Sequence, residues 1–138
     1  MPSRDTSTGW VLEQMVLPAL QRGEYQFRTQ VKVGLRPGGR THKVDAVVTK
    51  EDRTWLLSVK WQQVGGTAEQ KVPFEVICLA DAIERGSYES AYLVLGGPGW
   101  TLRDFYTGGG LRPHLTQIDR VRIVTLETFV ALANQAAL

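Results

Sequence analysis

The chain has 138 residues, of which 43% are hydrophobic and 22% charged, and its formal net charge at pH 7 is +2. This composition excludes a low-complexity or disordered chain, and the weakly polar stretches are too short to span a bilayer. The length suits one hydrophobic core, so we predict a single domain over residues 1–138. The N-terminus lacks the apolar core of a signal peptide, and the lone Cys78 excludes an internal disulfide. These features predict a cytoplasmic protein with no membrane association.

The first half of the chain predicts one helix and three strands. Apolar residues at helical spacing predict a helix over residues 10–20, and Pro18 should kink it or end its regular hydrogen bonding. Strict alternation predicts a half-buried strand over residues 25–33, with one set of side chains sharing a face: Tyr25, Phe27, Thr29, Val31 and Val33. After a Pro-Gly-Gly turn, a second strand is expected over residues 43–49, and a short polar turn leads to a third over residues 55–62.

A second helix is predicted after the Gly-Gly break. Residues 67–70 read Thr-Ala-Glu-Gln, a capping-box pattern that indicates a helix start, and Gly86 marks the end. Pro73 fits the first turn of a helix but not its interior. The helix would therefore begin either at the capping box or only at Val72, and the later start would leave Glu69 in a loop.

The last part of the chain supplies two more strands and a helix. A short apolar run predicts a central strand over residues 90–95, and an irregular glycine-rich segment follows it. We expect a last strand over residues 121–126 and a last helix over residues 127–138. Three meandering strands followed by a crossover helix predict an α/β fold with a mixed central sheet flanked by helices.

A basic stripe covers the first predicted hairpin. Between residues 25 and 44 there is no acid, but there are five basic side chains, namely Arg28, Lys32, Arg36, Arg40 and Lys43. A local basic stripe on a nearly neutral chain indicates contact with phosphate, and a solvated hairpin face is the alternative. His42 belongs to the same stretch, where we expect it to be solvated or hydrogen-bonded.

An ammonium group inside the third predicted strand requires a partner, because its desolvation is costly. Side chains alternate along a strand, so Lys60 shares a face with Ser58 and Gln62. Pairing through the turn at residues 50–53 brings Asp45 of the second strand opposite residue 58, beside Lys60. A buried ion pair is the simplest interpretation of this arrangement.

Further carboxylates favour a metal site over an isolated ion pair. Glu69 and Glu75 come back towards the same strand ends from the following segment, and Glu13 lies at the edge of the apolar face of the first helix. Several carboxylates around one lysine suit Mg²⁺, with Mn²⁺ as a substitute. The lysine would then orient or deprotonate a metal-coordinated water and offset charge on a phosphate.

These residues, in this order of elements, resemble the PD-(D/E)XK nuclease superfamily over about residues 8–96. The order is helix, strand, strand with Asp45, strand with Ser58-Val59-Lys60, then helix. The resemblance implies a restriction-endonuclease-like αβββαβ core and a Mg²⁺-dependent hydrolase that cleaves DNA. It also implies that Asp45 is the central metal ligand and Lys60 the catalytic lysine, with Gln62 lining the site.

One position departs from the family pattern. Ser58 stands where the superfamily has Asp or Glu, and a neutral hydroxyl is a poor ligand for Mg²⁺. Some type II restriction endonucleases also have Ser-x-Lys and take the missing carboxylate from the following helix. By that resemblance either Glu69 or Glu75 is the relocated ligand. Position on a helix face favours Glu75, whereas proximity to the strand end favours Glu69, which we slightly prefer.

The expected function is a DNA endonuclease, restriction-like or concerned with repair or recombination. The alternative is a catalytically inactive subunit that keeps the nuclease fold for DNA binding or assembly. The basic stripe would clamp the DNA backbone. Trp100 and Tyr106 of the irregular segment are expected to pack locally rather than to contact DNA. A chain of this size that cuts both strands would act as a symmetric homodimer.

Overall fold

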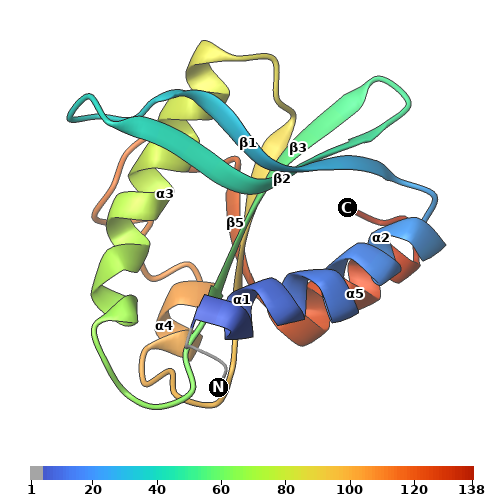
Figure 1. The fold of residues 1–138 in the computed structure, drawn as a ribbon. Coiled ribbons are helices and arrows are strands. Elements are labelled where there is room, and N and C mark those ends of the chain that lie inside the picture. The colour runs from blue at the N-terminus through green and yellow to red at the C-terminus, as the bar shows by residue number, and fades with distance from the viewer. Residues whose placement is uncertain (1–4) are drawn as a thin grey trace.

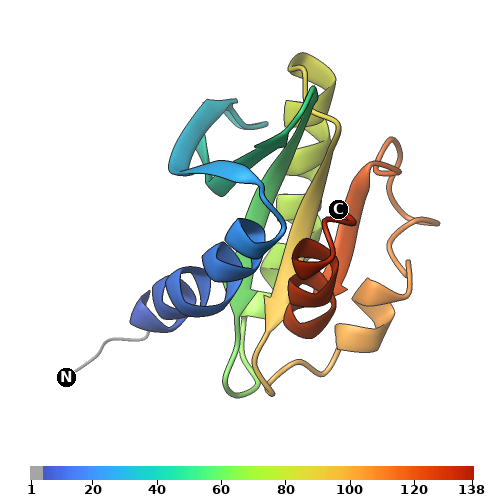
Figure 2. The ribbon, with the colours of Figure 1, turned by 90° about the vertical axis from the view of Figure 1, so that its right-hand side faces the viewer.

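The computed structural model describes residues 5–138 and consists of a five-stranded sheet with helices on both faces (Figures 1 and 2). The strand order is the chain order, with the first three strands antiparallel and the last two added in parallel. The elements are α1 (Asp5–Val11), η1 (Leu12–Val16), α2 (Leu17–Arg22), β1 (Gln26–Leu35), β2 (Thr41–Lys50), β3 (Arg53–Trp61), α3 (Ala68–Arg85), β4 (Ser90–Gly96), α4 (Arg103–Thr107), β5 (Val121–Thr125) and α5 (Leu126–Asn134). The predicted αβββαβ core with a mixed sheet is confirmed.

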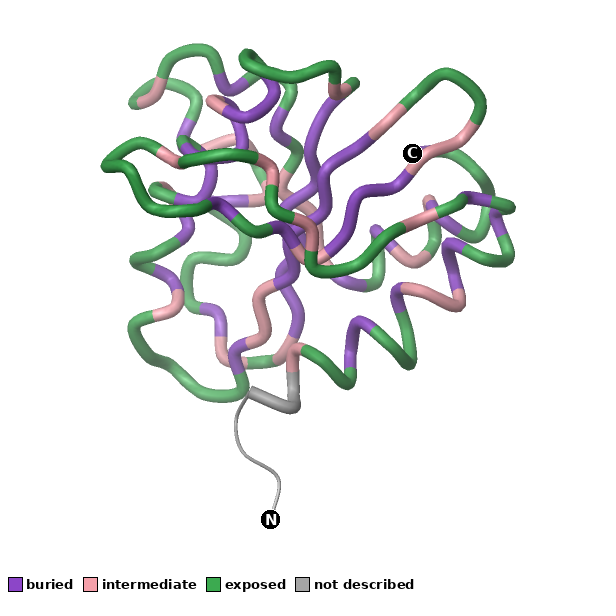
Figure 3. The backbone as a smooth tube through the Cα atoms, turned by 45° about the horizontal axis from the view of Figure 1, so that its top comes forward, coloured by how far each residue is buried: buried purple, intermediate pink, exposed green. Residues whose placement is uncertain are grey.

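The sheet separates two hydrophobic cores. One lies between the sheet and the helices α1, η1, α2 and α5, and the other lies between the sheet and α3. Strand β4, between β3 and β5, is buried along its whole length, whereas the tip of the β1–β2 hairpin is exposed (Figure 3). No helix within residues 5–138 is long and apolar enough to cross a membrane.

The N-terminal helix continues past Pro18, but its regular α-helical hydrogen bonding is interrupted just before that residue. The elements α1, η1 and α2 follow one another without a break, and η1 is a π-helical turn. The amide of Leu17 donates to the carbonyl of Leu12, five residues back. Pro18 has no amide hydrogen to donate, and the π-helical turn before it changes the hydrogen-bonding pattern so that the helix can continue.

Helix α3 begins at Ala68, so the alternative start at Val72 is wrong and Glu69 lies in the first turn. The side chain of Thr67 makes no capping hydrogen bond, although the pattern located the start. Pro73 lies inside the helix, where it cannot donate to the carbonyl of Glu69. The hydroxyl of Tyr106 donates to that carbonyl at 2.6 Å instead, which compensates for the lost helical bond.

The predicted common face of residues 25–33 is wrong, because β1 changes faces at Gln30. Tyr25 and Phe27 pack into the core under α2 and α5, whereas Val31 and Val33 pack into the core under α3. The reason is the backbone of Gln30, whose φ of 54° interrupts the alternation of side chains. The outer half of the β1–β2 hairpin therefore crosses over α3, where Arg85 donates to the carbonyl of Leu35 (Figure 1).

Candidate active site

Strands β2 and β3 separate at the position where the predicted site residues lie. Their pairing runs from Lys50 opposite Arg53 to Ala46 opposite Leu57 and stops there. Continuing this register puts Asp45 opposite Ser58, as the turn spacing predicted. The carboxylate oxygen Oδ2 of Asp45 accepts a hydrogen bond of 2.7 Å from the amide of Val59. Asp45 thus replaces the next backbone bond of the ladder and lies in the fork between the strands.

A cavity of about 520 Å³ opens at this fork. Asp45, Ser58, Lys60 and Glu75 all line it, so both acids and the predicted catalytic lysine face a common space. An adjoining hollow of about 640 Å³ shares Lys60 and Glu75 with the cavity and extends towards the tip of the β1–β2 hairpin. The two hollows form one open surface.

Glu75 reaches the cavity from α3 and is held by neighbours from both strands. Its Oε2 lies 3.5 Å from Nε2 of His42, and the Ser58 hydroxyl lies near the same carboxylate. Burial raises the pKa of Glu75, but the bond from His42, the charge of Lys60 and the Ser58 hydroxyl outweigh it, so the pKa is lowered. The side chain is therefore ionised at neutral pH.

The pKa of Asp45 is shifted in the opposite direction, upwards. Burial raises the pKa of its carboxyl, and the nearby charge of Glu75 raises it further. The amide of Val59 and the charge of Lys60 lower it without cancelling the effect of burial. The two acids repel each other, while the lining of the cavity also carries four basic side chains: Arg36, Lys43, Lys60 and Lys71.

Three residues expected at the site point elsewhere. The carboxylate of Glu69 accepts from the Thr101 hydroxyl at 2.7 Å and from the Leu102 amide at 2.6 Å. These bonds lower the pKa of Glu69 and attach its side chain to the start of α4. The amide of Gln62 donates to the carbonyl of Gly99 at 2.8 Å, and Glu13 is exposed on η1. None of the three lines the cavity.

The sequence did not identify two residues that line the cavity. His42 is 2% exposed, and strand alternation gave no reason to place it beside Glu75. Lys71 lines both hollows from α3. It lies one helical turn before Glu75, so helical spacing would have found it once Glu75 had been chosen.

The predicted basic stripe divides into two groups. Arg36, Arg40 and Lys43 line the two hollows. Lys32 lies opposite Lys43 in the ladder, on the same part of the hairpin. Arg28 lies opposite Val47, beyond the change of face at Gln30, and lines neither hollow.

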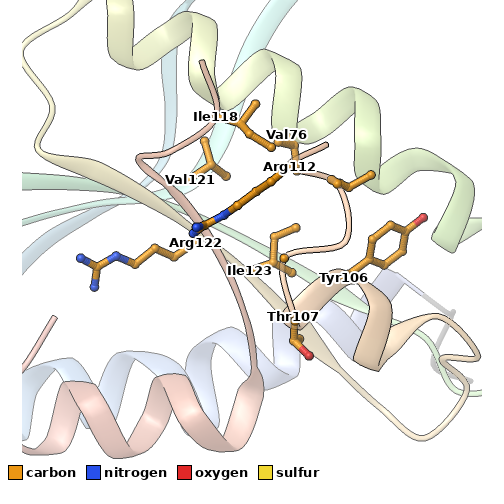
Figure 4. Close-up of a pocket in the computed structure, with 11 residues that line it drawn as sticks. Val76, Tyr106, Thr107, Arg112, Ile118, Val121, Arg122 and Ile123 are labelled. Carbon is orange, nitrogen blue, oxygen red and sulfur yellow. The ribbon is translucent and has the colours of Figure 1, made fainter. Parts of the chain in front are cut away.

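A separate hollow of about 370 Å³ lies between β5, α4 and the segment that joins them (Figure 4). Arg112 and Arg122 lie at its edge, and its walls include Val76, Tyr106 and Ile123. None of the candidate site residues lines it. Tyr106 is 4% exposed and bonded to Glu69, and buried Trp100 donates to the carbonyl of Gly96 at 2.7 Å. Both aromatic rings therefore pack locally.

Comparison with known proteins identifies the family. A family model described as PD-(D/E)XK nuclease superfamily domain matches residues 4–137, and no curated protein matches. A crystal structure of a protein of unknown function, AF1548, is 10% identical with a TM-score of 0.51, over 80% of this chain and 54% of that one. The small subunit of the heterodimeric restriction endonuclease R.BspD6I is 17% identical with a TM-score of 0.44, over 83% of this chain and 61% of that one. The chain thus spans less than two thirds of either structure.

Proposed function

The chain belongs to the PD-(D/E)XK nuclease superfamily, and on that premise we propose that it is a metal-dependent endonuclease that hydrolyses DNA phosphodiester bonds. The observation that carries this proposal is the convergence of Asp45, Glu75 and Lys60 on one open cavity at the fork of β2 and β3. The basic side chains that surround the same opening support a polyanionic substrate.

Asp45 and Glu75 fit a hard divalent cation. Mg²⁺ is commonly held by one or two carboxylates, with water and substrate phosphate as the remaining ligands. Two acids meet that requirement, although no cluster of three or more His, Cys, Asp or Glu was found in the described part of the chain. A cation here would also relieve the repulsion that contributes to the raised pKa of Asp45.

Glu75 takes the place of the acid that the family pattern puts at Ser58. Ser58 and Glu75 line the same cavity, so the small strand residue leaves room there for the acid from α3. Glu69 is the weaker candidate because its two carboxylate oxygens are bonded to Thr101 and Leu102.

The chemical roles follow from position and charge. A divalent cation would polarise the phosphate ester and make a water molecule more nucleophilic. Asp45 and Glu75 hold and orient that cation. Lys60 shares the cavity, where its ammonium group donates to a phosphate oxygen and offsets the charge that develops during cleavage.

The basic residues around the opening would position the DNA backbone. Arg36 and Arg40 come from the hairpin tip, Lys43 from β2 and Lys71 from α3, so they approach a bound strand from different elements. Contacts of this kind fix the register of DNA without reading its sequence. Cleavage of both strands would bring two copies of the chain together as a symmetric homodimer.

Nicking of supercoiled plasmid tests the proposal directly. The wild-type protein is expected to cut in Mg²⁺ or Mn²⁺ and to stop in EDTA, whereas Asp45→Ala and Lys60→Ala should not cut. Glu13→Ala is the matched control, because Glu13 is exposed and lines neither hollow. Equal cutting by all four proteins would place the activity elsewhere.

One observation favours an alternative, a nuclease-fold subunit that binds DNA without cutting it. A serine, Ser58, stands where the family pattern has the acid two residues before the lysine, and only Glu75 of the cavity lining could replace that acid. In that case the wild-type protein would retain plasmid in a mobility-shift assay but leave it uncut at every metal concentration.

A further inference from the structure

Gln30 has a backbone conformation that is unusual for its position. Its φ is 54°, in the left-handed region, and it lies inside β1 between the ladder pairs Thr29–Ala46 and Val31–Val44. Other non-glycine residues of the described chain with positive φ are Glu24, Glu51, Gln117 and Ala136, and these lie in turns or bends. A side chain with a Cβ atom is strained in this region, which glycine adopts freely and asparagine more readily than most residues.

The register places Gln30 directly opposite Asp45. The pairs on either side join Thr29 to Ala46 and Val31 to Val44, so residue 30 of β1 faces residue 45 of β2. The change of face that reorients the hairpin requires only the backbone of residue 30, which a glycine would supply at lower cost. A glutamine with an exposed side chain is therefore unexplained by the fold alone.

The side chain of Gln30 lies near the site. It is close enough to Asp45 to lower the pKa of that carboxyl. On the other side, Asp45 accepts from the amide of Val59 in β3. The carboxylate thus lies between a main-chain donor from β3 and the side chain of Gln30 from β1.

We infer that Gln30 is a positioning residue, whose amide fixes the Asp45 carboxylate in the orientation that binds the divalent cation. This inference rests on the proposed function, because it assigns Gln30 to the same metal site. Groups that orient a metal ligand commonly change metal affinity by about 10- to 100-fold when they are removed. The strained backbone of β1 is then maintained by the need to present this amide beside Asp45.

Gln30→Gly separates the side chain from the backbone. Glycine accepts a φ of 54° without strain, so we expect a melting temperature that is unchanged or a few degrees higher. The affinity for Mn²⁺, measured by calorimetry, should nevertheless fall about 10-fold or more. Glu51→Gly is the matched control, because Glu51 has a φ of 58° in the β2–β3 turn and lines neither hollow. It should relieve strain in the same way and leave Mn²⁺ affinity at the wild-type value.

The outcomes distinguish the inference from the function on which it rests. Wild-type Mn²⁺ affinity in Gln30→Gly would overturn the inference and leave the metal site standing. A large fall in melting temperature in Gln30→Gly would also overturn it, because the side chain would then be supporting the hairpin. If the wild-type protein takes up no Mn²⁺ in the same titration, the proposed function fails and the inference fails with it.

Discussion

The two glutamates of α3 provide a pair of substitutions that separates a metal ligand from a structural acid. Glu75→Gln keeps the size and hydrogen-bonding capacity of the side chain and removes its charge from the cavity that contains Asp45 and Lys60. Glu69→Gln makes the same chemical change at the start of the same helix, where the carboxylate is bonded to Thr101 and Leu102. We expect only the first change to affect metal binding.

The size of the effect follows from charge and distance. The attraction between a carboxylate and one unit of positive charge about 4 Å away contributes roughly 4 kcal/mol at an effective dielectric constant of about 20. Part of this is recovered when water replaces the lost ligand, so a cost of about 2.7 kcal/mol is a conservative expectation. That cost corresponds to a dissociation constant for Mn²⁺ that is about 100-fold higher in Glu75→Gln.

Glu69→Gln should instead weaken the fold. A carboxylate accepts through both oxygens, whereas an amide has one oxygen and a nitrogen that only donates. One of the bonds to Thr101 and Leu102 is therefore lost, and the other donor is left buried or must turn to water. The melting temperature should fall by several degrees, with Mn²⁺ affinity unchanged.

Calorimetric titration with Mn²⁺ and thermal melting in EDTA, carried out on both variants, decide the matter. Wild-type Mn²⁺ affinity in Glu75→Gln would refute the assignment of Glu75. Loss of affinity in Glu69→Gln without loss of stability would refute it as well and would return the ligand to the first turn of α3. Similar mild effects in both would indicate that Ser58 or water completes the site.

The pKa of Asp45 and the distribution of basic residues lead to two further predictions. Burial raises the pKa of Asp45 above 3.8, so its charge opposes folding once the pH exceeds the folded pKa. Without metal, Asp45→Asn should raise the melting temperature at pH 7. The gain should vanish below pH 3.8, where the acid is protonated in both the folded and the unfolded state. An equal gain at both pH values would show that the charge of Asp45 is not the cause. Arg40→Ala and Lys71→Ala should each reduce the slope of log DNA affinity against log salt concentration by about 0.9. Arg28 lies outside both hollows, so Arg28→Ala should leave the slope unchanged. Equal slopes for all three variants would mean that DNA binds at another surface.

The sequence predicted the central geometry because that geometry is local. A two-residue turn joins β2 to β3, so the pairing of Lys50 with Arg53 fixes every pair above it as far as Ala46 and Leu57. Asp45 and Ser58 come next, and the alternation of β3 directs Lys60 towards the same cavity. The family resemblance and the order of elements rest on the same short-range pattern.

The choice between Glu69 and Glu75 as the metal ligand could not be made from residues that are close together in the sequence. It depended on the start of α3, which Pro73 left ambiguous, and on the direction in which Glu69 points. The hydroxyl of Tyr106 allows the helix to begin before the proline, and Thr101 and Leu102 bind the Glu69 carboxylate. These partners lie more than thirty residues along the chain, in a segment with no periodic pattern, so spacing could not reveal them.

The change of face along β1 could not be predicted from the sequence either. Alternation of apolar and polar residues predicts a straight strand over residues 25–33, and nothing in that pattern marks Gln30 as left-handed. The change of face carries the outer part of β2 over α3, which brings His42 to Glu75. A glycine at residue 30 would have indicated an irregular backbone at this position, but the chain has a glutamine there.

Two residues of the site break rules that the rest of the fold obeys. Ser58 is 3% exposed in a strand whose other inward positions are apolar, and Gln30 has a strained backbone where glycine would serve the sheet better. Each lies near one of the acids and lowers its pKa, Ser58 that of Glu75 and Gln30 that of Asp45. Local departures of this kind are expected where function rather than packing selects the residue. If the proposed metal site is correct, these two departures lie beside the two carboxylates that would hold the cation.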